Sequence, residues 1–109
     1  MENDTLIFGL AEHHYDEIIQ IFRKYQTIEH VLIFGSRAKG SEKNYSDIDL
    51  AVIAPTMSNE EFSHLWNDLD SLDLVFKLDV LHWDTLDQKN LKESIMKHSQ
   101  FFYRPDVTR

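Results

Sequence analysis

The fold of this chain is decided by residues 31–40, which read VLIFGSRAKG. The first four are apolar and include β-branched residues, which is typical of a strand buried on both faces. Gly35 ends this strand, and Ser36 can cap a short helix that begins at Arg37. Backbone N–H groups at such a corner, followed by the start of a helix, favour an anion. We therefore predict a phosphate-binding turn at Gly35 and Ser36.

Two aspartates follow this turn on the next predicted strand, residues 47–54. Alternation along the strand places Ile48 and its apolar neighbours on the core face, and Asp47 and Asp49 on the other face. Carboxylates at alternate positions can converge on one hard cation, and Mg²⁺ usually takes one or two of them besides water and phosphate oxygens. A solvated strand end is the alternative for this pair. We predict a site for a nucleoside triphosphate with Mg²⁺.

A third carboxylate, Asp79, lies within the apolar strand predicted over residues 74–83. An unpaired charge in such a strand would be costly. Asp79 can complete a two-metal site or accept the proton of an attacking hydroxyl, provided that its strand pairs beside residues 47–54 in an aligned register. The alternative is a structural carboxylate paired with Lys77.

Helical periodicity and capping signals supply the other elements. Ser58 and Glu61 have the spacing of a capping box, and Trp66 falls on the apolar stripe of the helix that follows, so we expect it in the core. The order of elements implies an α/β or α+β sandwich, a small sheet covered on one side by helices. Helices are predicted over residues 11–26, from 58 to about 72 and over 89–97, with a short edge strand over 100–103.

Length, charge and composition exclude several classes of protein. The 109 residues make one domain, in which we expect 1–10 and 104–109 to be a loosely packed leader and tail. The absence of cysteine excludes disulfides and thiolate zinc sites, and the formal charge of −8 disfavours extended nucleic-acid binding. No stretch reaches the roughly 20 apolar residues that span a bilayer, so we expect a soluble, cytoplasmic protein. We also expect a partner to supply the acceptor.

The motif formed by Gly35-Ser36 and Asp47-x-Asp49, with Phe34 before it and Arg37-Ala38 within it, resembles the minimal nucleotidyltransferase (MNT) family of the DNA polymerase β superfamily. The resemblance extends from the first helix to Tyr103. It implies a nucleotidyltransferase fold with a small mixed β-sheet and the order α-β-α-β-α-β-α. It also implies Mg²⁺-dependent transfer of a nucleoside monophosphate, AMP from ATP, to a hydroxyl with release of pyrophosphate.

The same resemblance implies a partner and a set of site residues. Stand-alone MNT proteins are commonly encoded beside a small helical HEPN protein, which resembles an RNase toxin. The MNT chain is then its antitoxin in a hetero-oligomer, and in some pairs adenylylates the toxin on tyrosine. Two other functions stay open: neutralisation of the partner by binding without catalysis, and an aminoglycoside-type transferase. The implied catalytic and metal-binding residues are Asp47, Asp49 and Asp79, holding two Mg²⁺, and the implied nucleotide-binding residues are Gly35, Ser36, Arg37 and Ser46.

Overall fold

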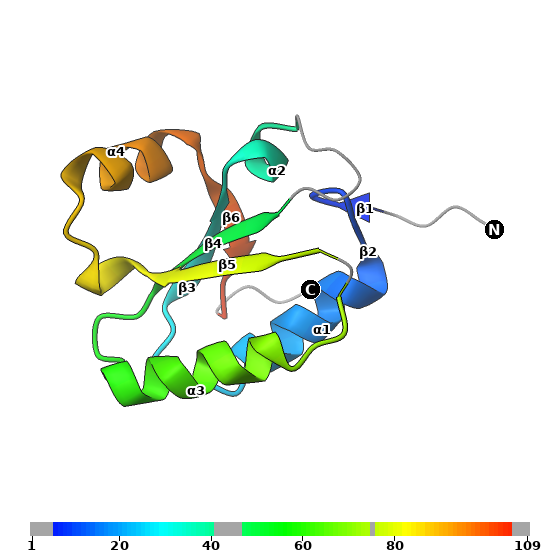
Figure 1. The fold of residues 1–109 in the computed structure, drawn as a ribbon, viewed down its shortest axis with the longest axis horizontal. Coiled ribbons are helices and arrows are strands. Elements are labelled where there is room, and N and C mark those ends of the chain that lie inside the picture. Colours follow the sequence, from blue (N-terminus) through cyan, green and yellow to red (C-terminus); the bar gives the residue numbers. More distant parts are fainter. Residues whose placement is uncertain (1–5, 41–46, 75, 106–109) are drawn as a thin grey trace.

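A four-stranded mixed sheet forms the centre of the molecule (Figure 1). The computed structural model describes residues 6–40, 47–74 and 76–105. Its strands are β3 (His30–Phe34), β4 (Ile48–Ile53), β5 (Leu78–His82) and β6 (Gln100–Tyr103), and they lie in the order β5–β4–β3–β6. β3 is antiparallel to both β4 and β6, whereas β4 and β5 are parallel. The predicted mixed sheet and edge strand are confirmed.

The parallel pair needs a long crossover, which α3 (Asn59–Asp70) supplies. Its N-cap is Ser58, whose hydroxyl accepts a hydrogen bond from the backbone N–H of Glu61 at 3.0 Å, so this half of the predicted capping box is confirmed. Leu65 and Leu69 point into the core, but Trp66 is 43% exposed. The prediction that Trp66 is a core residue is wrong because it lies at the margin of the apolar stripe.

The larger hydrophobic core lies between the sheet and two helices, α1 (Glu12–Phe22) and α3. α1 ends before the predicted Gln26, because the chain turns there and the N–H of Tyr25 donates to the carbonyl of Phe22 at 3.1 Å. Each element contributes apolar residues at its helical or alternating period. Fully buried members of this core include Ile18, Phe22, Val31, Ile33, Ile48, Leu50, Val52 and Leu65.

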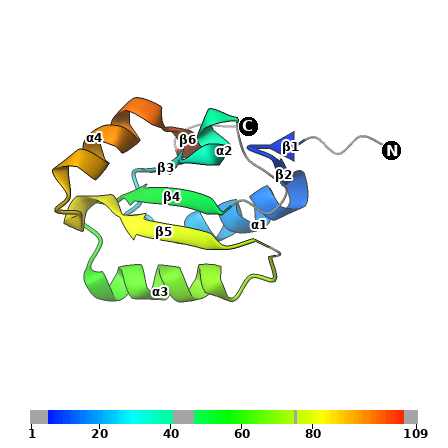
Figure 2. The same cartoon turned by 45° about the horizontal axis from the view of Figure 1, so that its top comes forward.

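The opposite face of the sheet is covered by α4 (Lys89–His98), as Figure 2 shows. Ile95, which is 1% exposed, packs there with Leu32 and Ala51. The prediction that helices cover one side of the sheet is therefore wrong, because the central strands are apolar on both faces and both need cover. None of the helices in the described ranges is both long and apolar enough to cross a membrane.

The N-terminal segment forms a small hairpin of β1 (Leu6–Ile7) and β2 (Leu10–Ala11). Phe8 and Gly9 connect the two strands with φ of 55° and 78°, the left-handed conformation that tight two-residue turns require. Leu10 is 1% exposed and belongs to the main core. The described part of the leader that we expected to be loosely packed is thus integral to the fold.

The segment around β5 differs from prediction at both ends. The strand begins at Leu78, later than the predicted residue 74, and a 3-10 helix η1 (Trp83–Thr85) follows it directly.

α2 (Ser36–Lys39) is the short helix predicted after Gly35. It is a single turn, and a helix of this length has little stability of its own.

Candidate active site

Two of the predicted site carboxylates lie side by side. Asp49 of β4 and Asp79 of β5 are register partners in the parallel pair. Their neighbours Leu50 and Val80 face the main core, so both aspartates face the side of the sheet that α4 only partly covers. They line a common pocket of about 310 Å³ with Phe34, Val80 and Leu81. The register that the sequence required for Asp79 is therefore present.

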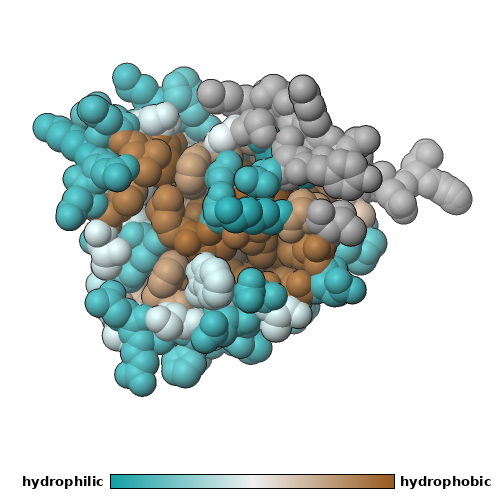
Figure 3. Space-filling view, viewed as in Figure 1, coloured by the Kyte–Doolittle hydropathy of each residue, from teal (hydrophilic) through white to brown (hydrophobic). Residues whose placement is uncertain are grey.

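Three of the residues that line this pocket are apolar, namely Phe34, Val80 and Leu81. Figure 3 shows apolar side chains gathered across the middle of the molecule, with a small hydrophilic patch among them and hydrophilic side chains around the rim. Low-polarity surroundings strengthen the interaction between charges that lie within them. The carboxylates therefore influence one another more strongly than they would in open solvent.

The surroundings of Asp49 change the pKa of its carboxyl group. Its pKa is raised, first by burial, then by the charge of Asp79 and then by that of Asp47, while Lys77 opposes these effects. Asp47 lies just before β4 and is exposed. In the described part of the chain, no three acidic or histidine side chains lie close enough together to form a ready metal site. Asp49 and Asp79 are thus direct neighbours in the sheet, whereas Asp47 acts on Asp49 through its charge.

Gly35 lies directly against the Asp49 carboxylate. Its φ of +80° is in the region that favours glycine, and a methyl group at this position would lie 2.5 Å from Asp49 Oδ2. Phe34, the residue before it, is the register partner of Asp49 in the antiparallel pair. The glycine turn and the carboxylate pair are therefore one site.

Arg37 is buried, at 3% exposure. Its guanidinium donates a hydrogen bond to the carbonyl of Phe8 at 2.9 Å and lies 5.4 Å from the centroid of the Phe76 ring. Both of these contacts are with other parts of the protein. The next residue, Ala38, accepts a hydrogen bond from Gln100 Nε2 at 2.5 Å. The prediction that Arg37 contacts phosphate stays a prediction.

The other predicted nucleotide-binding residues are placed less fully. The backbone of Ser36 begins α2 and follows Gly35, whereas Ser46 lies outside the described residues. Sequence reasoning missed Gln100 because no motif links it to a turn 62 residues away.

Lys77, the alternative partner predicted for Asp79, does contact this carboxylate. Lys77 Nζ lies 3.6 Å from Asp79 Oδ1, but the two side chains are 70% and 50% exposed. Such an exposed pair contributes little to stability.

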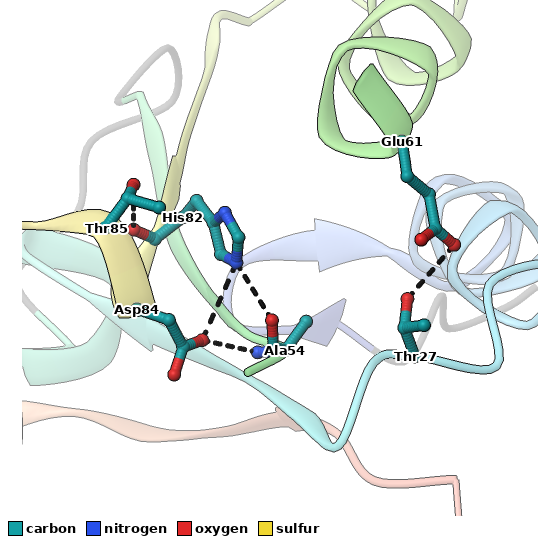
Figure 4. Close-up of polar contacts among 6 residues, drawn as sticks. All are labelled: Thr27, Ala54, Glu61, His82, Asp84 and Thr85. Carbon is teal, nitrogen blue, oxygen red and sulfur yellow. Dashed lines mark hydrogen bonds and ion pairs between the residues drawn. The ribbon is translucent and has the colours of Figure 1, made fainter. Parts of the chain in front are cut away.

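A second polar cluster lies at the other end of the same two strands (Figure 4). His82 is the register partner of Val52, and its ring stacks on Phe62 with a centroid distance of 5.2 Å. His82 Nε2 lies 3.0 Å from the Ala54 carbonyl oxygen, and the Ala54 N–H donates to Asp84 Oδ2 at 2.7 Å. Asp84 Oδ2 is also 3.6 Å from His82 Nε2. We call His82, Ala54 and Asp84 the strand-end clamp.

This mixed sheet with helices on both faces is a nucleotidyltransferase fold, and comparison with known proteins agrees. The chain belongs to the polymerase beta nucleotidyltransferase family, whose model matches residues 16–108. It is 39% identical over 72 residues to the probable protein adenylyltransferase MntA of Haemophilus influenzae. That alignment spans 62% of this chain and 59% of the relative.

Solved structures of toxin–antitoxin complexes share the fold. One, determined with AMP-PNP, has 23% sequence identity and a TM-score of 0.66, covering 84% of this chain and 74% of the other. A second contains a tri-AMPylated HEPN toxin of Shewanella oneidensis with its MNT antitoxin. It has 21% identity and a TM-score of 0.61, covering 85% of this chain and 71% of the other. At these identities the likeness establishes the fold.

Proposed function

We propose that this chain is a Mg²⁺-dependent nucleotidyltransferase that moves AMP from ATP to a hydroxyl of a HEPN partner and so acts as its antitoxin. The observation that carries the proposal is the pairing of Asp49 with Asp79 directly beneath the Gly35 turn. Two carboxylates next to a glycine that keeps space free form a site for a cation together with a phosphate.

The donor set fits Mg²⁺. Burial and the charges of Asp79 and Asp47 raise the pKa of Asp49, so the ionised cluster lacks sufficient positive charge nearby. A divalent cation held by Asp49 and Asp79, with Asp47 contributing, would remove that repulsion, and carboxylate oxygens are the ligands that Mg²⁺ prefers. When bound, the metal would neutralise the charge that develops on the transferred phosphoryl group.

The residues of the chain itself would then position the substrates. The Gly35–Ser36 backbone would hold the triphosphate, because the lack of a side chain at position 35 leaves the space beside Asp49 free. We assign Ser46, which lies outside the described residues, to the same role from the motif alone. The acceptor oxygen would attack the α-phosphorus, and the bond to the oxygen that bridges the α- and β-phosphorus atoms would break, releasing pyrophosphate. Asp79 would accept the proton of the attacking hydroxyl, because it faces the pocket and is partly exposed.

Similarity to known proteins supports the acceptor and the partner. A curated relative is a probable protein adenylyltransferase, and a structural neighbour is an MNT antitoxin bound to an AMPylated HEPN toxin. We therefore propose that this chain assembles with a HEPN protein in the cytoplasm, where ATP and Mg²⁺ are available, and modifies it.

The proposal is tested by measuring the transfer of label from ATP to the HEPN protein. The chain is incubated with Mg²⁺, ATP labelled on the α-phosphate, and the protein encoded by the gene beside its own, as the proposed HEPN acceptor. We expect the HEPN protein to become labelled, and Asp49→Asn to reduce the rate by at least about 10- to 100-fold, the cost already seen when only a partner of a metal ligand is changed. Asp87→Asn, which changes an exposed carboxylate between η1 and α4, is the matched control and should label normally.

The outcomes separate the proposed functions. Absence of labelling with any nucleoside triphosphate would contradict transfer. If the unlabelled HEPN protein still formed a stable complex with the chain and lost its toxicity, neutralisation by binding alone would be the function. Under that alternative, Asp49→Asn would leave neutralisation unchanged.

A further inference from the structure

The turn between Gly35 and Gly40 cannot fix its own position. It contains only one helical turn, α2, and each flanking glycine has a positive φ, +80° and +76°. Isolated helices of this length are not stable, and glycine allows more backbone conformations than other residues. The orientation of this turn beside Asp49 therefore depends on contacts from other parts of the chain.

Two such contacts come from opposite ends of the sequence. From the N-terminal side, the carbonyl of Phe8 accepts the hydrogen bond from Arg37 at 2.9 Å. From the C-terminal side, Gln100 of β6 donates to the carbonyl of Ala38 at 2.5 Å. The two contacts hold adjacent residues of α2, so together they restrain both its position and its rotation.

Both contacts connect to β6. The Phe8 ring stacks on Phe102 with a centroid distance of 5.9 Å, and Gln100 is the first residue of the same strand. β6 is paired with β3, whose end leads into the turn. The hairpin and β6 thus form a frame around α2.

Arg37 also reaches the segment that leads to Asp79. Its guanidinium lies 5.4 Å from the centroid of the Phe76 ring, and Phe76 is three residues before Asp79 along the sequence. A planar guanidinium can stack on a ring while its edge donates hydrogen bonds, which a lysine ammonium cannot do. One buried side chain therefore contacts the hairpin and the approach to β5 from within the turn.

We propose that Arg37 and Gln100 are positioning residues for nucleotide binding: they hold the Gly35–Gly40 turn against Asp49, so that its backbone is arranged for a phosphate before the nucleotide arrives. This inference rests on the proposed function, because the nucleotide site is part of that proposal. It gives the arginine of the motif a role through protein contacts, and it adds a residue of β6 to the functional set. Preorganisation of this kind improves affinity by lowering the cost of ordering the site.

The first experiment removes the contact from β6. Gln100→Met keeps the length of the side chain but cannot donate to Ala38, and Gln88→Met, at the exposed start of α4, is the matched control. The full chain is titrated with Mg²⁺-ATP by calorimetry, and its melting temperature is measured without nucleotide. We expect Gln100→Met to raise the Kd for ATP about 5- to 10-fold, the effect of one hydrogen bond. Its melting temperature should fall below that of the control by no more than about 8 °C, the effect of one hydrogen bond in a domain of this size.

The second experiment separates positioning from direct phosphate contact by Arg37. Arg37→Lys keeps the charge, and Gly9→Val disrupts the turn that presents the Phe8 carbonyl, because valine rarely adopts a φ of +78°. If both changes break the same contact, each should raise the Kd, and the double variant should resemble Arg37→Lys to within about twofold. Multiplication of the two effects would overturn the positioning role of Arg37.

The controls distinguish this inference from the function beneath it. If the wild-type chain binds Mg²⁺-ATP and Gln100→Met binds it as tightly as Gln88→Met does, the inference for Gln100 is wrong while the proposed function stands. If the wild-type chain does not bind ATP at all, the proposed function is wrong and the inference falls with it.

Discussion

The two ends of the β4–β5 pair show how differently the same two strands use polar side chains. At one end Asp49 faces Asp79, two like charges in register, and burial adds to the cost of ionising Asp49. At the other end His82 and Asp84 are matched with the N–H and carbonyl of Ala54. The strand-end clamp uses its polar groups to join the strand ends, whereas burial and the neighbouring charges around Asp49 oppose folding at neutral pH. Groups that weaken the fold are expected where a site serves chemistry.

The largest effect on this difference between the two ends is expected from filling the space between position 35 and the Asp49 carboxylate. Gly35→Ala should reduce AMP transfer at least about 100-fold, because misplacement by about 1 Å is enough for such a loss. The methyl group would meet Asp49 Oδ2 at 2.5 Å. The measurement is the rate of labelling of the proposed HEPN partner.

Gly40→Ala is the matched control for this change. Gly40 has a similar φ of +76°, but a methyl group there would meet none of the described residues within 4 Å. Both variants should lose about 1 to 2 kcal/mol from the backbone conformation, as measured by denaturant unfolding. Equal losses of activity in the two variants would show that backbone strain, and not proximity to Asp49, is responsible.

A substitution in the strand-end clamp should instead lower stability and leave labelling nearly unchanged. His82→Ala removes a buried ring that stacks on Phe62 and leaves the Ala54 carbonyl without its imidazole partner. We expect the free energy of unfolding to fall by about 2 to 4 kcal/mol, while labelling well below the melting temperature stays within about threefold of wild type, since a residue at the far end of the strands should affect the site little. A loss of transfer without a loss of stability would place His82 in the site and remove the contrast.

The unfavourable surroundings of ionised Asp49 should be visible in the pH dependence of stability. Because the folded-state pKa of Asp49 is raised above its usual value of 3.8, the folded protein holds this proton more tightly than the unfolded chain does. The stability from that group is fully present below the usual value and is lost as pH rises through the folded pKa. Asp49→Asn should therefore be more stable than wild type at neutral pH, by less than about 1 kcal/mol because the site is partly exposed.

Two controls accompany this measurement. The difference between Asp49→Asn and wild type should vanish at a pH below the usual value of 3.8. Adding Mg²⁺ at neutral pH should stabilise wild type more than Asp49→Asn, because binding to the folded state alone raises stability. A variant that is less stable than wild type throughout the pH range would contradict the unfavourable role assigned to Asp49.

The smallest effect is expected at Lys77. If Asp79 were a structural carboxylate paired with Lys77, removing the lysine would be costly. The contact is 3.6 Å long and both side chains are at least half exposed, so Lys77→Met should change the free energy of unfolding by less than about 0.5 kcal/mol. Urea unfolding of the two proteins side by side gives the comparison, and a loss above about 2 kcal/mol would support the structural role.

Local signals in the sequence were sufficient for most of the elements. The alternation after Asp47 predicted both the strand and the faces of its side chains, and the apolar strand around Asp79 pointed to a neighbour in register. The hairpin was missed because strands of two residues have no measurable period, and its turn begins at Phe8, which rarely adopts a positive φ. Helical periodicity identified α4, but it does not specify which face of a sheet the helix covers.

The candidate site was predictable where its residues are close in sequence and not where they are distant. Gly35 and Asp49 belong to one motif, whereas Gln100 reaches Ala38 across 62 residues and has no motif of its own. The burial of Arg37 depends on a carbonyl in the N-terminal hairpin, which no pattern around Arg37 indicates. Contacts set by tertiary packing are the part that sequence reasoning missed.

The frame around α2 has a consequence for how the protein is made. During translation Gly35 and Asp49 are synthesised before Gln100, whose side chain holds the turn. Contacts between distant parts of a chain also form slowly because a long loop must close first. The nascent chain therefore carries the complete motif for some time before it can hold the motif in place. Under the proposed function, a chain halted before β6 should bind ATP more weakly than one that includes this strand.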